Sequence, residues 1–301
     1  MTESIVKLEH KMKVSKDLHT VVQTMKVMAA TNIRQYEKSI LSLDEYSLGV
    51  ELGLGLCLRK ISNTTSIVSD KVFLRDKEER KVCIILFGSD QGLVGQFNKS
   101  IGDYGIETLK ELGGKQVIWG VGKILCHYLI DAGVHLKDTF ALPNSVKQIE
   151  ALVSQILIEI VNQKMNHEYD ELFLIFNKKT SEINNEQMKL RLLPLDYFWQ
   201  IELEKREWPE NTLPEVLDTN IKMLKKLIKE YLFISIYRAC AHSLTSENSS
   251  RLSSMQRADK NINELLDHLN EVYQRVRQSS IDEELFDIIS GFEALSKKPA
   301  H

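Results

Sequence analysis

Residues Glu215 to Ser290 read EVLDTNIKMLKKLIKEYLFISIYRACAHSLTSENSSRLSSMQRADKNINELLDHLNEVYQRVRQSSIDEELFDIIS, a stretch without a single Gly or Pro. As one α-helix it would be about 110 Å long, because each residue adds about 1.5 Å. A compact domain cannot enclose such a helix, since helices in globular proteins average about 11–12 residues. The stretch therefore predicts either several shorter helices or one long helix that belongs to a coiled coil.

A second stretch free of Gly and Pro, Met1 to Leu48, lies at the other end of the chain. It is long enough for about 70 Å of helix. Its apolar residues keep mostly three- and four-residue steps, which is typical of one helical face: Ile5, Leu8, Met12, Leu18, Val22, Met25, Ala29, Ile33, Tyr36, Ile40 and Leu43. The same steps recur in the C-terminal stretch through Ile221, Leu224, Ile228 and Tyr231, and through Ala258, Ile262, Leu265, Leu269, Val272 and Val276. The two stretches are predicted to pair as a long antiparallel coiled coil.

The apolar pattern weakens between Ser243 and Ser254, where eight of twelve residues are Ser, Thr or Asn. Such residues hydrogen-bond readily to the nearby backbone and favour turns. Leu244, Leu252 and Met255 leave only a thin apolar stripe. The composition of this segment therefore leaves a loop and a continuous helix equally open.

The middle of the chain has a different character, since 13 of the 14 glycines lie between Gly49 and Gly133. Short β-rich runs alternate there with helical patterns. Strands are predicted at Val82–Phe87, Gln116–Trp119 and Glu171–Phe176, with an edge strand at Met188–Leu195, and helices at Asn98–Leu112, Lys123–Ala132 and Val146–Met165. This alternation predicts a parallel sheet covered on both faces, in a domain at about residues 70–205. The fold class is thus α/β, a Rossmann-like parallel-sheet domain between two coiled-coil helices.

Charge and composition exclude several classes of protein. The formal net charge is −3 with 27% charged residues, so no basic excess indicates a nucleic-acid partner. No apolar run approaches 18 residues, and we expect no direct insertion into a membrane. The four cysteines have no CxxC spacing and are interpreted as buried thiols in a reducing compartment. The eight histidines form no HExxH motif, so we expect no metal site.

Glycines after two of the predicted strands raise the question of nucleotide binding. Gly88, Gly92 and Gly95 follow the first strand but lack the GxGxxG spacing. Gly122 and Lys123 are followed by Ile124, where a Walker loop needs Ser or Thr. We interpret these glycines as tight strand-to-helix turns. Since no catalytic triad can be assembled either, the sequence predicts no cofactor and no catalytic residue.

Three segments of this chain, in this order, resemble the gamma subunit of F-type ATP synthases. They are Thr24–Ala30, TMKVMAA; Gly88–Asn98, GSDQGLVGQFN, which is similar to that family's SDRGLCGGFN; and Tyr273–Leu295, YQRVRQSSIDEELFDIISGFEAL. The resemblance extends from one end of the chain to the other. Gln91, Val94, Gln96 and Asp282 depart from the family's usual residues. These departures leave open a divergent second type of F-type complex.

The resemblance implies a fold and a mechanical function. Residues 1–60 and 211–301 would form the coiled-coil helices, residues 61–210 would form the α/β domain, and the helix would continue through Ser243–Ser254. The chain would be the non-catalytic rotor shaft that couples ion flow through the membrane sector to ATP synthesis or hydrolysis. Its partners would be the alpha and beta subunits of the catalytic ring, the epsilon subunit and the membrane c-ring. It would lie peripherally at the cytoplasmic face of the inner membrane.

The resemblance also implies which residues contact other subunits. Met25 and Lys26 match the family's segment beside a beta-subunit loop, and Arg277 and Gln278 match the pair that contacts the beta catch loop. Arg251 matches an arginine low on the shaft, and Asp90 belongs to the SDQGLVGQFN segment. Without the resemblance, the alternative is a small-molecule-binding α/β protein whose terminal helices dimerise.

Overall fold

A computed structural model describes residues 4–62, 80–165, 169–180, 185–195, 197–206, 208–209, 212, 214 and 219–296. By its internal contacts the chain divides into two units. Unit 1 consists of Met1–Met28 and Ser253–His301, and unit 2 is Ala29–Leu252. The domain boundaries at 60/61 and 210/211 stay predictions. At the ends of the predicted C-terminal helix, residues 211, 213, 215–218 and 297–301 lie outside the described residues.

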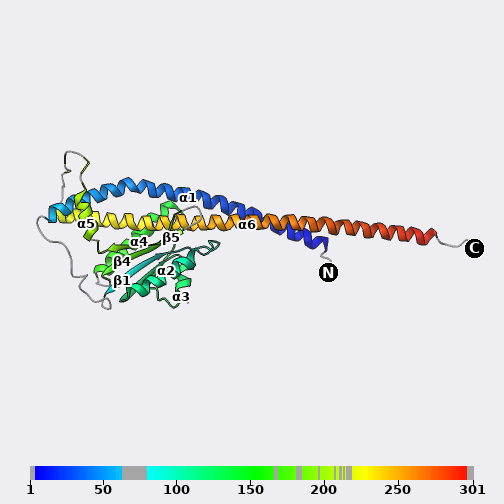
Figure 1. Cartoon of the computed structure of the whole chain (residues 1–301), viewed down its shortest axis with the longest axis horizontal. Coiled ribbons are helices and arrows are strands. Elements are labelled where there is room, and N and C mark those ends of the chain that lie inside the picture. Colours follow the sequence, from blue (N-terminus) through cyan, green and yellow to red (C-terminus); the bar gives the residue numbers. More distant parts are fainter. Residues whose placement is uncertain are drawn as a thin grey trace, which may run out of the picture. The chain divides into compact units, whose positions relative to one another are not determined.

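Two long helices dominate the chain, as predicted: α1 spans Ile5–Ser62 and α6 spans Asn220–Ser296 (Figure 1). Helix α6 is continuous through Ser243–Ser254, so the helical alternative for this segment is confirmed and the loop alternative is wrong. Thr245 Oγ1 donates to the carbonyl of Ala241 at 2.8 Å, and Asn248 Nδ2 donates to that of Leu244 at 2.8 Å. These polar side chains therefore bond back onto the helix instead of interrupting it.

Helices α1 and α6 run antiparallel within each unit. In unit 2, Asn32 contacts Asn248 at 3.4 Å, Tyr46 contacts Glu230 at 2.9 Å, and Asp44 forms an ion pair with Arg238. In unit 1, the hydroxyl of Tyr273 donates to Glu9 Oε1 at 3.0 Å, and Lys26 contacts Asp259 at 2.9 Å. In both units, residue numbers fall along α6 as they rise along α1. The predicted antiparallel pairing is therefore confirmed.

The α/β domain in unit 2 contains a five-stranded sheet in the order β3-β2-β1-β4-β5. The strands are β1 (Lys81–Phe87), β2 (Lys115–Val121), β3 (Asp138–Phe140), β4 (Glu171–Lys179) and β5 (Asn185–Leu193). All pairs are parallel except β4 with the edge strand β5. The helices are α2 (Phe97–Leu112), α3 (Lys123–Asp131), α4 (Val146–Met165) and α5 (Tyr197–Lys205).

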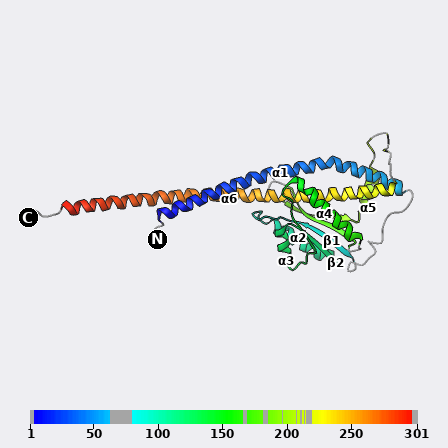
Figure 2. The ribbon, with the colours of Figure 1, turned by 180° about the vertical axis from the view of Figure 1, so that it is seen from behind.

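Each face of the sheet is covered by different helices, because successive residues of β1 point to opposite sides. Val82, Ile84 and Leu86 pack with α2 and α3. Cys83, Ile85 and Phe87 pack in a core to which α4, α6 and the buried Tyr36 of α1 also contribute. Figure 2 shows α4 over the sheet on the side of α1 and α6. The α6 segment of unit 2 is thus part of the core of the α/β domain.

Candidate subunit-contact sites

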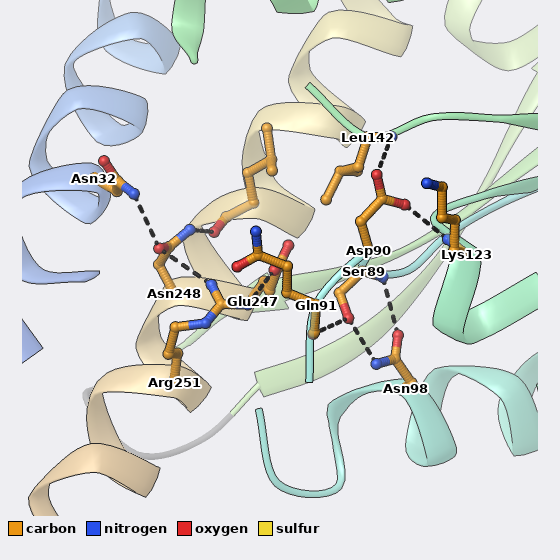
Figure 3. A network of polar contacts seen from close by, with 11 residues as sticks. Asn32, Ser89, Asp90, Gln91, Asn98, Lys123, Leu142, Glu247, Asn248 and Arg251 are labelled. Atoms are coloured by element: carbon orange, nitrogen blue, oxygen red, sulfur yellow. Dashed lines mark hydrogen bonds and ion pairs between the residues drawn. The ribbon is translucent and has the colours of Figure 1, made fainter. Parts of the chain in front are cut away.

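The turn after β1 is held by a short network of buried hydrogen bonds (Figure 3). The backbone N–H of Ser89 donates to Asn98 Oδ1 at 2.9 Å, and Asn98 Nδ2 donates to Ser89 Oγ at 2.7 Å. Ser89 Oγ in turn donates to the carbonyl of Gln91 at 3.0 Å. The Asn98 side chain, from the start of α2, therefore accepts the hydrogen bond of the Ser89 N–H. This backbone N–H is the donor that a phosphate bound in the loop would need.

Two glycines of the turns are required by close packing. A Cβ on Gly88 would lie 2.2 Å from the Cβ of Leu125, and one on Gly122 would lie 2.7 Å from the N of Ser89. Gly122 also has φ = 101°, a backbone conformation that other residues rarely adopt. The contacts between the β1–α2 turn and the start of α3 explain these glycines without a bound nucleotide.

Asp90 links the turn to two other segments of the α/β domain. Its Oδ1 accepts from the backbone N–H of Lys123 at 2.7 Å, and its Oδ2 accepts from that of Leu142 at 3.1 Å. The first bond gives a partner to the Lys123 N–H, which has no acceptor within α3 because it lies in the first turn. The negative charge of Asp90 also interacts favourably with the positive end of the helix dipole. Both oxygens of Asp90 are therefore used inside the domain. Its contact with another subunit stays a prediction.

Arg251 forms a buried ion pair on α6. Its Nη2 lies 2.6 Å from Glu247 Oε1, one helical turn away, and its Nη1 donates to Asn248 Oδ1 at 3.5 Å (Figure 3). Burial raises the pKa of Glu247 to about 7, although the Arg251 guanidinium acts in the opposite direction. The Arg251 guanidinium is thus bonded within unit 2. Its contact with another subunit stays a prediction.

Lys26 is bound to α6 inside unit 1. Its Nζ lies 2.9 Å from Asp259 Oδ2, while Oδ1 of the same carboxylate accepts from Gln23 Nε2 at 2.9 Å and lies 3.0 Å from His19 Nε2. The hydrogen bond from Lys26 is the largest cause that lowers the pKa of Asp259. Three successive turns of α1 thus converge on one carboxylate. Met25, beside Lys26, is half-buried.

Arg277 and Gln278 are exposed on α6, as their predicted role in an interface requires. Tyr273, one turn before Arg277, and Val276, directly before it, are half-buried, and Tyr273 contacts Glu9 of α1. The two polar side chains therefore lie away from the contact with α1. Whether they bind a ring subunit stays a prediction.

Exposed apolar residues form stripes that were not predicted from the sequence. On α6 the four- and three-residue steps of Ile281, Leu285, Ile288 and Phe292 place these residues on one face, and their side chains are 52–77% exposed. On α1 of unit 1 a second stripe runs through Val14, Leu18, Val21 and Met28. We name the first the α6 apolar stripe. Its spacing is visible in the sequence, but the spacing alone does not tell an exposed face from a packed one.

The sequence pattern assigned several apolar residues to the coiled-coil seam, that is, to the contact between α1 and α6. For three of them this assignment is wrong. Leu18 is 53% exposed, and Ile221 and Leu265 are also exposed. Ser15, three residues before Leu18 on α1, is buried instead. A small side chain fits where two helices approach closely, whereas a larger one can face outward on the same helix.

Within the described residues, no group of His, Cys, Asp and Glu side chains is arranged to hold a metal ion. In the same part of the chain, no helix has the length and apolar character needed to cross a bilayer. All four cysteines are free thiols and buried, as predicted.

Comparisons with known proteins agree with this architecture over most of the chain. The ATP synthase family model matches residues 4–295. Similar curated proteins include the ATP synthase gamma chain of Syntrophus aciditrophicus, 27% identical over 92% of this chain and 93% of that one. The gamma chain of Campylobacter curvus is 28% identical over 96% of this chain and 98% of its own length.

Solved structures share the fold. A chain in the Euglena gracilis mitochondrial ATP synthase, solved as OSCP/F1/c-ring, covers 99% of this chain and 97% of its own length, with a TM-score of 0.65 and 16% identity. A chain in the central stalk/c-ring structure of the Tetrahymena thermophila enzyme covers 79% of this chain and 99% of its own length, with a TM-score of 0.56 and 18% identity. From the match of the family model over residues 4–295, this chain belongs to the ATP synthase family.

Proposed function

We propose that this chain is the central rotor shaft of an F-type ATP synthase. It is a non-catalytic subunit, and its rotation couples ion flow through the membrane sector to ATP synthesis or hydrolysis in the alpha–beta ring. The end-to-end match to gamma chains supports this function. The observation that carries it is the antiparallel pairing of α1 and α6 in both units, together with the exposed α6 apolar stripe.

The α6 apolar stripe is the proposed contact with the alpha–beta ring. Single exposed apolar residues are common on proteins, but a run on one helical face indicates a surface that another protein covers. Hydrophobic contacts are non-directional, so an apolar face can turn inside a ring without breaking specific bonds. Met25, Arg277 and Gln278 would then supply the contacts that distinguish one ring subunit from the next.

Removing the stripe tests this contact. We expect the triple variant Leu285→Ser, Ile288→Ser and Phe292→Ser to be retained several-fold less by alpha and beta subunits after a salt wash, because the buried apolar area is lost. The change should leave the folded chain nearly as stable as the wild type, since all three side chains are exposed. The measurement is the ratio of this chain to beta subunit in the purified complex.

The control carries Leu41→Ser and Leu48→Ser, two exposed apolar residues of α1 in unit 2. Retention of the control at the wild-type ratio is expected. Equal retention of the triple variant and the control would show that the ring does not cover the stripe.

The remaining partners are proposed to bind unit 2. We propose that the epsilon subunit and the membrane c-ring contact the α/β domain and the nearby shaft, with the chain held peripherally at the cytoplasmic face of the inner membrane. An open groove of about 640 Å³ between α1, α4 and α6 supports a docking site for epsilon. Tyr46, Leu157, Ile158, Val161 and Phe233 line it.

A charge placed in this groove is expected to release epsilon. Ile158 is 63% exposed on α4, so Ile158→Glu should fold normally but disfavour an apolar partner by burying a carboxylate. Epsilon recovered with the complex should fall at least several-fold, as measured by quantitative mass spectrometry. The matched control is Ile130→Glu, because Ile130 is 54% exposed on α3 outside the groove. Loss of epsilon from both variants, or from neither, would contradict this docking site.

A further inference from the structure

The α6 segment from Ser243 to Arg251 is buried although most of its side chains are polar. Ser243 and Ser246 are fully buried, and Glu247 and Asn248 are only 4% exposed. Polar side chains are rarely buried in a protein interior without bonding partners, because an unpaired buried group is costly. An apolar segment would bury its surface more favourably. The polar composition therefore calls for a role other than stability.

The segment is hydrogen-bonded to three different neighbours in unit 2. Ser243 Oγ donates to the carbonyl of Phe87, the last residue of β1, at 3.4 Å. On another side, Asn185 Nδ2 at the start of β5 donates to Ser250 Oγ at 2.8 Å and to the carbonyl of Ser246 at 3.4 Å. These bonds tie α6 to two strands of the same sheet.

The third neighbour is α1, through Asn248. Asn248 Oδ1 accepts from Asn32 Nδ2 at 3.4 Å and from Arg251 Nη1 at 3.5 Å (Figure 3). The buried ion pair with Glu247 holds the Arg251 guanidinium in place. Within about two helical turns, α6 is thus bonded to β1, β5 and α1.

Hydrogen bonds and apolar contacts resist rotation of a helix differently. An apolar contact has no preferred bond angle, so it resists the rotation of a helix through close packing alone. A hydrogen bond weakens steeply once its angle falls below about 120°. Along the rest of unit 2, α6 packs mainly through apolar residues such as Leu232 and Ile236, and Glu230 and Arg238 bind α1. The polar segment is therefore where rotation of α6 would break its directional bonds to the strands of the sheet.

We propose that residues 243–251 form a keyed joint that fixes the rotational setting of α6 in the α/β domain, with Asn185 as a positioning residue. This inference rests on the proposed function, in which the domain and the shaft helix must turn together. Torque applied to the domain reaches α6 through the bonds of the joint. Without them, the domain slips around the helix during part of each turn, and ATP hydrolysis proceeds without the full movement of ions.

The test compares hydrolysis with ion transport in the same preparation. The complete complex, with the variant chain, is reconstituted in lipid vesicles, and ATP hydrolysis and the membrane potential are followed together. A potential-sensitive dye serves for either coupling ion. We expect the double variant Asn185→Ala and Ser250→Ala to hydrolyse ATP within about two-fold of the wild-type rate, whereas potential generated per ATP falls at least about three-fold. Ser250→Thr, which keeps the hydroxyl, should couple as the wild type does.

Two comparisons separate this role from a loss of stability. Ile84→Val removes one methyl from the core on the α2–α3 face, so it destabilises the domain without touching the joint. It is expected to keep the wild-type potential per ATP. Wild-type coupling in the double variant, or an equal loss in Ile84→Val, would overturn the proposal.

The same experiment distinguishes this proposal from the proposed function. If the wild-type chain failed to assemble or supported no potential at all, the rotor function itself would be wrong. If the double variant did not assemble, Asn185→Ala alone decides by the same criterion, because it leaves the Ser250 hydroxyl in place.

Discussion

Replacing Ser249 by proline is expected to destabilise the folded chain by about 3 kcal/mol or more and to prevent its assembly. Ser249 lies in the interior of α6 and is buried in unit 2. Proline has no N–H to donate, and its ring clashes with the carbonyl of the residue four positions earlier, here Thr245. The segment is also packed against neighbours, so the helix cannot bend freely to relieve the clash.

Ser249→Ala is the control, because alanine removes the hydroxyl but preserves the helix. Thermal unfolding measures both variants, and the proline variant should unfold on the order of 5–10 °C below the alanine variant. Equal unfolding temperatures would show that the helix is not continuous through this segment.

The double variant Arg277→Ala and Gln278→Ala is expected to assemble normally but to lower ATP turnover of the complex several-fold. Both side chains are exposed in the isolated chain, so their removal should cost little stability. A charge-assisted hydrogen bond from an arginine to a ring carboxylate contributes roughly 1.5–3 kcal/mol when partly buried. The same contact on a free surface contributes under about 1 kcal/mol. The size of the effect therefore reports whether the ring encloses these residues.

The matched control is Gln274→Ala with Arg275→Ala, since these residues are exposed on the same helix one turn earlier. ATPase rates are compared at equal assembly yield. Unchanged turnover in the Arg277 and Gln278 variant would mean that these side chains form an ordinary solvated surface. An equal decrease in the control would indicate a general requirement for positive charge on α6.

The sequence was sufficient to predict the large elements of the fold. Stretches without Gly and Pro predicted the two long helices, and alternating strand and helix patterns predicted the parallel sheet and an edge strand, but not that the edge strand β5 pairs antiparallel with β4. Strand β3 was missed because its three residues are too few for a periodic pattern to emerge. Helix α5 was also missed, although α3, which has the same length of nine residues, was predicted.

The packing of the long helices was harder to predict. Three- and four-residue steps describe more than one stripe on a helix, and the choice between them depends on a partner far away in the sequence. Leu18 was assigned to the seam for this reason, although it is exposed. The bond between Lys26 and Asp259 joins residues 233 positions apart, so no local pattern indicates it. Similarly, the neighbours that bury Ser243 and Ser246 come from β1 and β5.

The alternative of a small-molecule-binding protein with dimerising helices is not supported. The family match includes both terminal helices and the α/β domain, over residues 4–295. Helices α1 and α6 pair with each other within the chain. The faces that form this pairing are therefore not available to pair with the helices of a second copy.

Direct observation of rotation tests the central claim. Lys99 is exposed on α2 and the four native cysteines are buried, so Lys99→Cys gives a single accessible thiol for a visible probe. The alpha–beta ring is fixed to a surface through its beta subunits, and the probe is followed by microscopy after ATP is added. The account predicts continuous rotation in one direction that stops when ATP is exhausted. A probe that only fluctuates about one position, while the same immobilised complexes hydrolyse ATP, would contradict it.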